Sequence, residues 1–563
     1  MGERIFIGVA WPYANGPLHL GHVAGAYLPA DIFARYHRLK GDDVLMVSGS
    51  DQHGTPITIR AEQESKSPQE IASKYHQQFV NCWQKLGISF DLFTTTGTAN
   101  HAQVTHDVFL TLLNKGYIYK DKMLEAYCPK CQRFLPDRYL EGICPYCGFP
   151  KARGDECDEC GKPLEPSMLK DVRCYLCSTP ARFEVAEHLF LRLSAFQDKL
   201  EAWIKEQSHW RHNVLSTTWK FLHEGLRDRA ITRDINWGVT IPLPGFEQKR
   251  IYVWFEAVIG YLSASKEWAK LHGDDAAWQP FWQGESKSFY FVGKDNIFFH
   301  TLIWPAMLMG YGGLVLPYNV PANEFLTIEG KKFSTSRNWA VWLPDYLERY
   351  DPDPLRYALA AGMPETGDSD FSWDKFVHRN NDELVATYGN LAHRILTFTY
   401  RNFNEMVPSP GELDGQSQAL LCKAEATLNE VDRALHRCSF REAIKYAMSL
   451  AQESNRYLDA QSPWKVIKET PEASAKSSYT VLSVLSTLKT VLYPFLPFSS
   501  EKLHTLLGFA GSVKETGWKF ESPLPGQKIP PPQPLFVKLD DSIIAQEISR
   551  LGCVSHWWDK EKE

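Results

Sequence analysis

The chain has 563 residues, of which 44% are hydrophobic and 23% charged, and its formal net charge is −6. This length predicts several domains, because one hydrophobic core rarely serves more than about 300 residues. The negative charge argues against a strongly basic nucleic-acid coat but does not exclude a local basic groove. No apolar run reaches the ~20 residues of a membrane-spanning helix, and the N-terminus lacks the apolar core of a signal peptide. We therefore expect a globular, cytoplasmic protein with no membrane partner.

Two buried strands and a helix are predicted near the N-terminus. The strands are residues 4–10 and 43–49, and the helix between them runs from about 20 to 40. This order predicts a β-α-β unit with a parallel pair of strands. Further helices are predicted at 68–87 and 100–115, from the spacing of their apolar residues.

Polar residues stand where these first elements meet. His19 and His22 lie three positions apart at the start of the helix, with Gly21 between them. A helix N-terminus binds phosphate readily, and residues three apart share one face. A glycine there leaves room for a flat group such as adenine on the backbone. Asp51 follows the second strand, where ligands of parallel sheets bind. A capping histidine and a surface histidine would explain the pair alone equally well, and Asp51 would suit a turn at a strand end.

Alternating patterns resume in the middle of the chain, at "RIYVWFEAVIGYL" from 250, "SFYFVGKD" from 288 and "NEFLTIEGKKFSTS" from 323. We expect these segments to form the second half of a split nucleotide-binding sheet. Gly293, Lys294 and Asp295 would follow one of these strands. The segment "GKKFSTS" offers lysines and hydroxyl groups, which suits a polyphosphate, although an ordinary solvated loop looks the same.

Cysteine spacing is the strongest local signal. Eight of the twelve cysteines form four C-x-x-C pairs within residues 128–177. In a chain without an export signal this pattern predicts metal ligands, and eight thiols fit two tetrahedral, structural zinc sites. Sequential pairing would close loops of 12 and 13 residues, whereas nested pairing spans 9 and 42 residues. Both stay open, and we favour nesting because both middle pairs read C-x-x-C-G. The ligands are Cys128, Cys131, Cys144, Cys147, Cys157, Cys160, Cys174 and Cys177.

Long helical patterns begin near residue 375. They cover 381–404, 416–435, 438–459 and 475–492 and predict an all-α domain, followed by a Pro-rich linker at 522–534 and a short tail. Asn390 and Arg394 share a helix face, and Trp464 follows Pro463 at the end of another helix. Such side chains read single-stranded bases by hydrogen bonding and stacking, although alone they would pass for a surface patch.

Together these motifs resemble a class I aminoacyl-tRNA synthetase. "HLGH" stands where that class has His-Ile-Gly-His, and "KFSTS" where it has Lys-Met-Ser-Lys-Ser. The methionyl-tRNA synthetase family is more similar still. Its blocks are matched in order between about residues 4 and 500 by "PYANGPLHLGH", "DQHGTP", "FLPDRYLEG", "YVWFEAVIGY", "GKDNIFFH", "WPAML", "GNLAHR" and "SPWKV".

The resemblance implies a fold and a domain order. The fold is an α/β split nucleotide-binding (Rossmann-like) catalytic domain with a zinc-knuckle connective insert, followed by an all-α anticodon-binding domain. The expected domains are the first catalytic half at 1–116, the insert at 117–225 with zinc knuckles at about 125–180, the second catalytic half at 226–322, a stem-contact region at 323–378, the helical anticodon-binding domain at 379–520, and a linker and tail at 521–563.

The resemblance also implies the chemistry. ATP with Mg²⁺ would activate L-methionine to methionyl-adenylate, and the methionyl group would pass to the 3′ end of tRNA(Met), including initiator tRNA. We expect a monomer. The implied ATP site comprises Gly21, His19, His22, Gly293, Asp295, Lys332, Ser334 and Thr335. The implied methionine site comprises Trp11, Tyr13, Asp51, Trp254, Ala257, Tyr261, Ile297 and His300. Asn390, Arg394 and Trp464 would recognise the CAU anticodon.

One residue departs from the family pattern. Thr335 stands where the signature has its second lysine, which is credited with stabilising the pyrophosphate leaving group. A threonine hydroxyl carries no charge, so another cation must serve. We expect catalysis to rest on His19, His22 and Lys332, with Lys294 or Lys331 assisting.

Two other functions remain open at this stage. Another class I synthetase, for leucine, isoleucine, valine or cysteine, would share the signatures. Against it stand the aromatic "YVWFEAVIGY" block, an insert too short for a large editing domain, and thiols that cluster away from the amino-acid site. A non-catalytic, zinc-dependent nucleic-acid-binding protein would explain the cysteines but not "HLGH" or "GKD".

Overall fold

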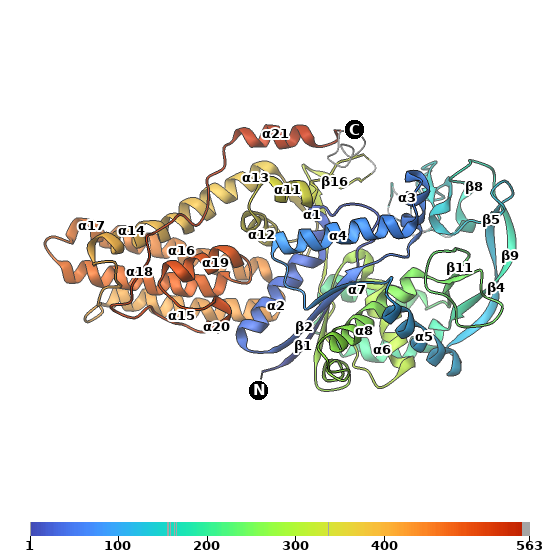
Figure 1. Ribbon diagram of the computed structural model, residues 1–563, viewed down its shortest axis with the longest axis horizontal. Helices are drawn as coiled ribbons and strands as arrows, with labels where there is room; N and C mark the ends of the chain where they lie inside the picture. Colours follow the sequence, from blue (N-terminus) through green and yellow to red (C-terminus); the bar gives the residue numbers. More distant parts are fainter. Residues whose placement is uncertain are drawn as a thin grey trace.

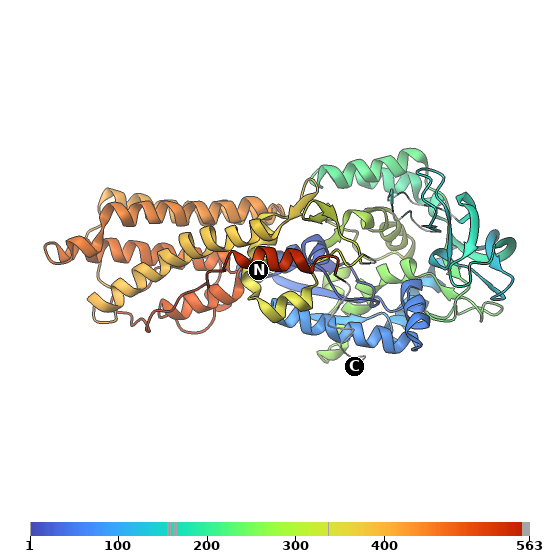
Figure 2. The same cartoon turned by 90° about the horizontal axis from the view of Figure 1, so that it is seen from above.

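The computed structural model describes residues 2–553 except Asp155, Glu156, Asp158, Gly161, Pro163, Glu165 and Ser336. The molecule is elongated, with an α/β body and a cysteine-rich insert at one end and a bundle of long helices at the other (Figures 1 and 2). Among the described residues no helix combines the length and apolar character needed to cross a bilayer. The predicted class, a split α/β domain with an insert and an all-α domain, is confirmed.

A five-stranded parallel sheet forms the centre of the α/β body. Its strand order is β14–β13–β1–β2–β3, so the two halves of the sequence meet between β1 and β13. Successive side chains of β1 enter opposite cores, and the sheet is therefore buried on both faces. The strands predicted at 4–10, 43–49 and 288 are confirmed. The strands are β1 (Arg4–Val9), β2 (Asp43–Ser50), β3 (Leu92–Thr95), β13 (Lys287–Gly293) and β14 (Ala322–Asn323).

Helices cover both faces of this sheet. Residues 20–40 form one continuous rod, in which the π-helical turn η1 separates α1 from α2. α2 and α4 share a core with the sheet on one face, and α5, α8 and α10 share a second core on the other. The helices are α1 (Leu20–His22), η1 (Val23–Tyr27), α2 (Leu28–Lys40), α3 (Thr55–Glu64), α4 (Pro68–Leu86), α5 (Ala99–Asn114), α8 (Val253–Leu271), α9 (Gln279–Trp282), η5 (Lys294–Asn296), η6 (Phe299–Ile303) and α10 (Trp304–Tyr311).

The expectation of a strand from residue 250 is wrong. Only β12 (Arg250–Ile251) is extended, and it pairs with β11 (Thr232–Arg233) outside the main sheet, while helix α8 begins at Val253. α8 is buried on nearly every side. Its apolar residues therefore show no helical periodicity, and a short apolar run of this kind cannot be told from a strand by pattern alone. The segment from 323 also leaves the main sheet after β14.

The cysteine-rich insert is built on a long antiparallel ribbon of β4 and β9, paired from Ile118 with Leu191 to Tyr127 with Arg182. A small sheet ordered β7–β6–β8 sits at its tip. The elements are β4 (Ile118–Cys128), β5 (Arg133–Phe134), η2 (Asp137–Tyr139), β6 (Leu140–Ile143), β7 (Ala152–Arg153), η3 (Pro166–Met168), β8 (Lys170–Cys174), β9 (Arg182–Leu191), η4 (Leu193–Phe196), α6 (Gln197–Lys205), α7 (His212–Glu224) and β10 (Arg229–Ala230).

A three-stranded sheet, ordered β16–β15–β17, and three helices connect the catalytic body to the bundle. The predicted long helices of the all-α domain are confirmed, with the first divided into η7 and α14. The elements are β15 (Leu326–Ile328), β16 (Lys331–Lys332), α11 (Leu343–Arg349), α12 (Pro352–Ala361), β17 (Ser369–Phe371), α13 (Trp373–His378), η7 (Arg379–Gly389), α14 (Asn390–Asn402), α15 (Gly415–His436), α16 (Phe440–Gln461), α17 (Pro463–Val466), α18 (Pro471–Leu492), α19 (Pro497–Leu506) and α20 (Val513–Thr516).

The C-terminal segment is more than a linker and tail. After the Pro-rich stretch, helix α21 (Ser542–Arg550) returns along the bundle to α13, as Figure 1 shows. The buried carboxylate of Glu547 accepts two hydrogen bonds from Arg349 and one from Tyr350. Beyond it, the N–H of Gly552 donates to Asn338 O at 3.0 Å. This segment therefore contacts the region that carries the "KFSTS" motif.

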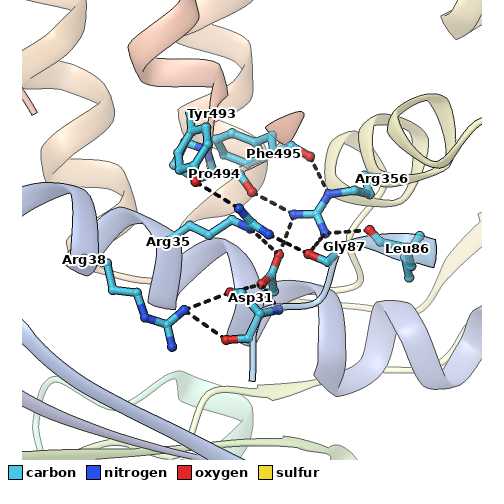
Figure 3. A network of polar contacts seen from close by, with 10 residues as sticks. Asp31, Arg35, Arg38, Leu86, Gly87, Arg356, Tyr493, Pro494 and Phe495 are labelled. Atoms are coloured by element: carbon cyan, nitrogen blue, oxygen red, sulfur yellow. Dashed lines mark hydrogen bonds and ion pairs between the residues drawn. The ribbon is translucent and has the colours of Figure 1, made fainter. Parts of the chain in front are cut away.

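A buried ionic joint fastens the two halves of the molecule together (Figure 3). Asp31 lies on α2, and its Oδ2 accepts from Arg35 Nε at 2.9 Å and from Arg356 Nη2 at 2.6 Å. Arg356, on α12, also donates to the carbonyls of Pro494 and Phe495, where α18 ends. One guanidinium thus connects the first helix of the catalytic body to the helical bundle.

Candidate active site

A cavity of about 540 Å³ opens at the carboxyl ends of β1, β2 and β13, where parallel sheets of this type bind ligands. Each strand delivers part of its wall: residues 10–13 follow β1, Asp51 follows β2, and Gly293 ends β13. The first turn of the α1 rod forms another side. The wall residues discussed below are Trp11, Tyr13, His19, Gly21, His22, Gly25, Asp51, Trp254, Ala257, Tyr261, Gly293, Asp295, Phe299, His300, Glu324, Lys332 and Phe333.

The two histidines cap their helix and line the cavity at the same time. His19 Nδ1 accepts the N–H of Gly21 at 3.1 Å, and His22 Nδ1 accepts the N–H of His19 at 3.1 Å. A ring nitrogen that accepts carries no proton, so each neutral ring holds its proton on Nε2. Burial lowers the pKa of His22 to about 4 and the pKa of His19 well below its usual range. At neutral pH both rings are therefore uncharged donors.

The loop with "KFSTS" lies across these histidines. The ring of Phe333 stacks on His19 with centroids 4.6 Å apart, and Lys332 reaches the cavity wall. Lys331 lies instead over the ring of Trp339, at 4.4 Å. Ser334 pairs with Trp339 through the backbone, which places Ser334 and Thr335 in a turn beside the cavity rather than in its wall.

Aromatic side chains form the deep end of the cavity. Trp254 Nε1 donates to Tyr13 Oη at 2.6 Å, which fixes both rings. His300 Nδ1 donates to Asn296 O at 2.9 Å, so its Nε2 accepts the proton of Tyr261 Oη at 2.7 Å. Burial lowers the pKa of His300 to about 4. This end is uncharged, polarisable and aromatic, as a thioether prefers.

Two glycines make room for Trp11 in this wall. A Cβ on Gly49 would lie 2.2 Å from the indole ring, and a Cβ on Gly260 would lie 2.8 Å from it. Both distances are shorter than real Cβ contacts, and a side chain at either position would displace the ring. The glycines of β2 and α8 therefore shape the cavity from behind.

Asp51 supplies a buried carboxyl group at the edge of the aromatic wall. Its backbone pairs with Tyr13, and its Oδ1 accepts the N–H of His53 at 3.2 Å. Burial and the nearby carboxylate of Glu256 raise the pKa of Asp51 to about 8. A cation that enters the cavity would relieve this cost, so Asp51 is suited to an ammonium group.

The eight paired thiols gather into two groups of four, in the nested arrangement. Within the groups the Sγ atoms of Cys128 and Cys177 are 3.5 Å apart, and those of Cys144 and Cys160 are 3.9 Å apart. Tetrahedral zinc with Zn–S bonds of about 2.3 Å would separate its sulfurs by about 3.8 Å. Both groups therefore fit zinc. They are Cys128, Cys131, Cys174 and Cys177, and Cys144, Cys147, Cys157 and Cys160.

A third cluster of potential ligands, Glu125, His188 and Asp234, needs no metal. Lys249 lies within hydrogen-bond reach of both Asp234 and His188. Its ammonium group pairs with Asp234, and His188 Nε2 lies 3.1 Å from Glu125 Oε2, so side chains of the protein already pair with both carboxylates.

In the helical domain, Arg394 and Trp464 meet. The guanidinium lies 4.7 Å from the centre of the indole ring and donates to Asp459 at 2.8 Å. Asn390 stands one turn earlier on α14 and is exposed. Trp464 is 37% exposed, so part of its ring is accessible to a ligand. The three residues form one accessible surface, far from the cavity.

Comparison with known proteins identifies the family. The family described as tRNA synthetases class I (M) matches residues 5–396, and the family described as the anticodon binding domain of methionyl tRNA ligase matches residues 407–555. The chain belongs to the methionyl-tRNA synthetase family. The match decides against the leucine, isoleucine, valine and cysteine enzymes and against a non-catalytic zinc protein.

Individual relatives agree with the family assignment. A methionine–tRNA ligase of Dehalococcoides mccartyi is 61% identical over 98% of this chain and 100% of its own length. One of Thermomicrobium roseum is 51% identical over 98% of this chain and 99% of its own. Mycobacterium tuberculosis methionyl-tRNA synthetase in complex with methionyl-adenylate superposes with a TM-score of 0.80 at 27% identity, over 95% of this chain and 99% of that one.

Most residues that the resemblance implies for ATP and methionine line the cavity, but three of them do not. Ile297 is buried behind the wall, and Ser334 and Thr335 lie in the adjoining turn. Lys294 is held by Glu324 at 2.7 Å and by Asp368 at 2.8 Å. Its ammonium group therefore points to these carboxylates, and a role for Lys294 at the phosphates stays a prediction.

Some residues of the cavity wall were not predicted from the sequence. Phe333 is the middle residue of the quoted loop, and Phe299 immediately precedes His300 in the "GKDNIFFH" block. Their neighbours in these motifs were the available signal. No motif in the sequence indicated Gly25, because its role depends on its position in the fold. A Cβ on Gly25 would meet nothing within 4 Å and would point into open space.

Proposed function

We propose that the chain is a methionine–tRNA ligase. A carboxylate oxygen of methionine attacks the α-phosphorus of ATP, the bond to the β-phosphate breaks, and pyrophosphate leaves with the electron pair. A hydroxyl of the terminal adenosine of tRNA(Met), initiator tRNA included, then attacks the carbonyl carbon of methionyl-adenylate, and AMP leaves. The observation that carries this proposal is the meeting, in one cavity, of the helix-capping histidines, a buried carboxyl group and an aromatic pocket.

The amino-acid half of the cavity has the chemistry that methionine needs. Asp51, with the backbone near Trp11, would hold the ammonium group. Tyr13, Trp254, Ala257, Tyr261 and His300 would surround the thioether, with Ile297 supporting them. Shape would reject competitors, since each misfit group typically costs about 1–3 kcal/mol.

The nucleotide half would act by position and by electrostatics. His19 and His22 would donate Nε2–H to phosphate oxygens, because each Nδ1 already accepts a backbone N–H. Gly25 leaves open space for adenine or ribose, whereas a Cβ on Gly21 would lie 2.9 Å from the His19 ring. Gly21 would face the adenine with its backbone, and Gly293 and Asp295 lie at the end of β13. The positive charge of Lys332 would stabilise the negative charge on the leaving pyrophosphate. Mg²⁺ would accompany ATP.

The remaining parts would serve tRNA and stability. Two zinc ions, each with four thiolates and no open position, would be structural rather than catalytic. Asn390, Arg394 and Trp464 would read the CAU anticodon. We predict a monomer, which the mass of the native protein in solution tests.

ATP–pyrophosphate exchange tests the proposal. Exchange should require methionine and should not be supported by leucine or isoleucine. Trp254→Ala should raise the Michaelis constant for methionine far more than that for ATP. Equal effects on both constants, or exchange with another amino acid alone, would disprove the assignment of the pocket.

A further inference from the structure

A second carboxylate lies buried behind the Asp51 site. Glu256, on α8, is 0% exposed, in the same helix as the cavity residues Trp254 and Ala257. Burying a carboxylate is costly unless it is paired. Its partners are two buried histidines rather than a lysine or arginine.

These contacts form a continuous chain from α5 to Asp51. The Nδ1 of His101, on α5, lies 2.9 Å from Ser263 Oγ, which leaves Nε2 to carry the proton that faces Glu256. Its Nε2 lies 3.5 Å from Glu256 Oε2. His53 Nδ1 contacts the other oxygen of Glu256 at 3.0 Å.

The chain ends on Asp51 itself. The backbone N–H of His53 donates to Asp51 Oδ1, so the residue that Glu256 anchors by its side chain also positions Asp51 by its main chain. Burial would lower the pKa of His53, but Glu256 and Asp51 outweigh it and raise that pKa. The same contacts hold the pKa of Glu256 below its usual value against the effect of burial.

We propose that Glu256 is a positioning residue for amino-acid activation, which acts through His53 to hold Asp51 in place and to set the charge that Asp51 presents to the ammonium group of methionine. The inference rests on the proposed role of Asp51. It assigns opposite electrostatic effects to two neighbours. The negative charge of Glu256 disfavours ionisation of Asp51, and the positive charge of His53 favours it.

The titratable surroundings of Asp51 are few in the described part of the chain. They come from its own loop, from α8, from α5, from the segment after β1 and from the insert. His53, Glu256 and Tyr13 interact with Asp51 directly. His101 interacts with Glu256 and His53, and Arg138 and Tyr252, the residue before α8, interact with Tyr13.

The pH dependence of kcat/KM for methionine, measured by pyrophosphate exchange between pH 6 and 9.5, tests the proposal. This parameter reports ionisations of the free enzyme, and its acid limb should follow Asp51. Glu256→Gln removes the negative charge that disfavours ionisation of Asp51, and it also removes the partner that favours a positive charge on His53. The effect of Glu256 on Asp51 is the larger of the two, so the acid limb should move to lower pH by up to about one unit. In His53→Gln only the cation is lost, and the limb should move to higher pH. The amino group of methionine titrates alike in every variant.

Controls separate a positioning role from a packing role. Glu267→Gln removes a carboxylate of the same helix that accepts from Thr94 at 3.0 Å, and it should leave the limb in place. Loss of packing alone would lower activity at every pH without opposite shifts. If Glu256→Gln does not fold, the alkaline shift of His53→Gln decides. Asp51→Asn should abolish the limb; if it does not, the proposed function of Asp51 fails. If Asp51→Asn abolishes the limb while His53→Gln and Glu256→Gln leave it unmoved, or move it in one direction, the role of Glu256 is refuted.

Discussion

Asp31→Asn should destabilise the joint between the catalytic body and the helical bundle (Figure 3). Both Asp31 and Arg356 have fully buried side chains. Burial would raise the pKa of Asp31, but Arg35, Arg356 and the hydrogen bonds of Ser89 outweigh it and lower the pKa from 3.8 to about 2. A shift of this size corresponds to about 2–3 kcal/mol of stabilisation by the charged form. Removing one partner of a buried ion pair typically costs about 3–5 kcal/mol, which sets the upper end.

Urea unfolding of the full chain at pH 7, followed by circular dichroism, measures the free energy of unfolding, and Asp31→Asn should lower it in the first transition. Because the folded pKa of Asp31 is lowered, its contribution is complete above about pH 4 and disappears as the pH falls towards 2. The gap between wild type and Asp31→Asn should therefore narrow over this range. Asp374→Asn, whose side chain is 64% exposed, is the control and should cost less than about 0.5 kcal/mol. A loss below about 1 kcal/mol for Asp31→Asn, or one equal to that of the control, would refute the reasoning.

Three further predictions concern the site and its domains. Lys332→Ala should slow single-turnover adenylate formation by on the order of a hundredfold, the typical effect of losing one transition-state donor. Thr335→Ala should slow it much less. A large loss of rate in Thr335→Ala with almost none in Lys332→Ala would reverse the two roles. Metal analysis of unchelated protein should find two zinc ions per chain, and Cys157→Ala should destabilise the insert and weaken aminoacylation; one ion or none contradicts the assignment. Trp464→Ala should weaken tRNA charging while methionine-dependent pyrophosphate exchange stays nearly intact, because the indole lies far from the cavity; comparable losses in both assays would make it a packing residue.

The sequence by itself determined the helices and strands that follow from the pattern of neighbouring residues. The strands at 4–10 and 43–49, the rod that starts at His19 and the long helices of the bundle follow from runs and periods of apolar residues, which the sequence displays directly. The spacing of the C-x-x-C pairs likewise identified the thiols of the two groups. In these strands and helices the spacing set by the backbone places the apolar residues on the buried face. The sequence pattern therefore matches the observed fold.

Tertiary structure alone decided what depends on distant partners. The ribbon of β4 and β9 brings Cys128 beside Cys177, and this closes the nested pairing that spacing left open. Lys294 is paired with Glu324 and Asp368, partners that the "GKD" block does not indicate. The sequence of α8 resembles a strand because nearly every side of the helix is buried, which removes the periodicity that marks a helix. In each case the deciding contact joins residues far apart in sequence, and its energy depends on burial and charge, which no local pattern records.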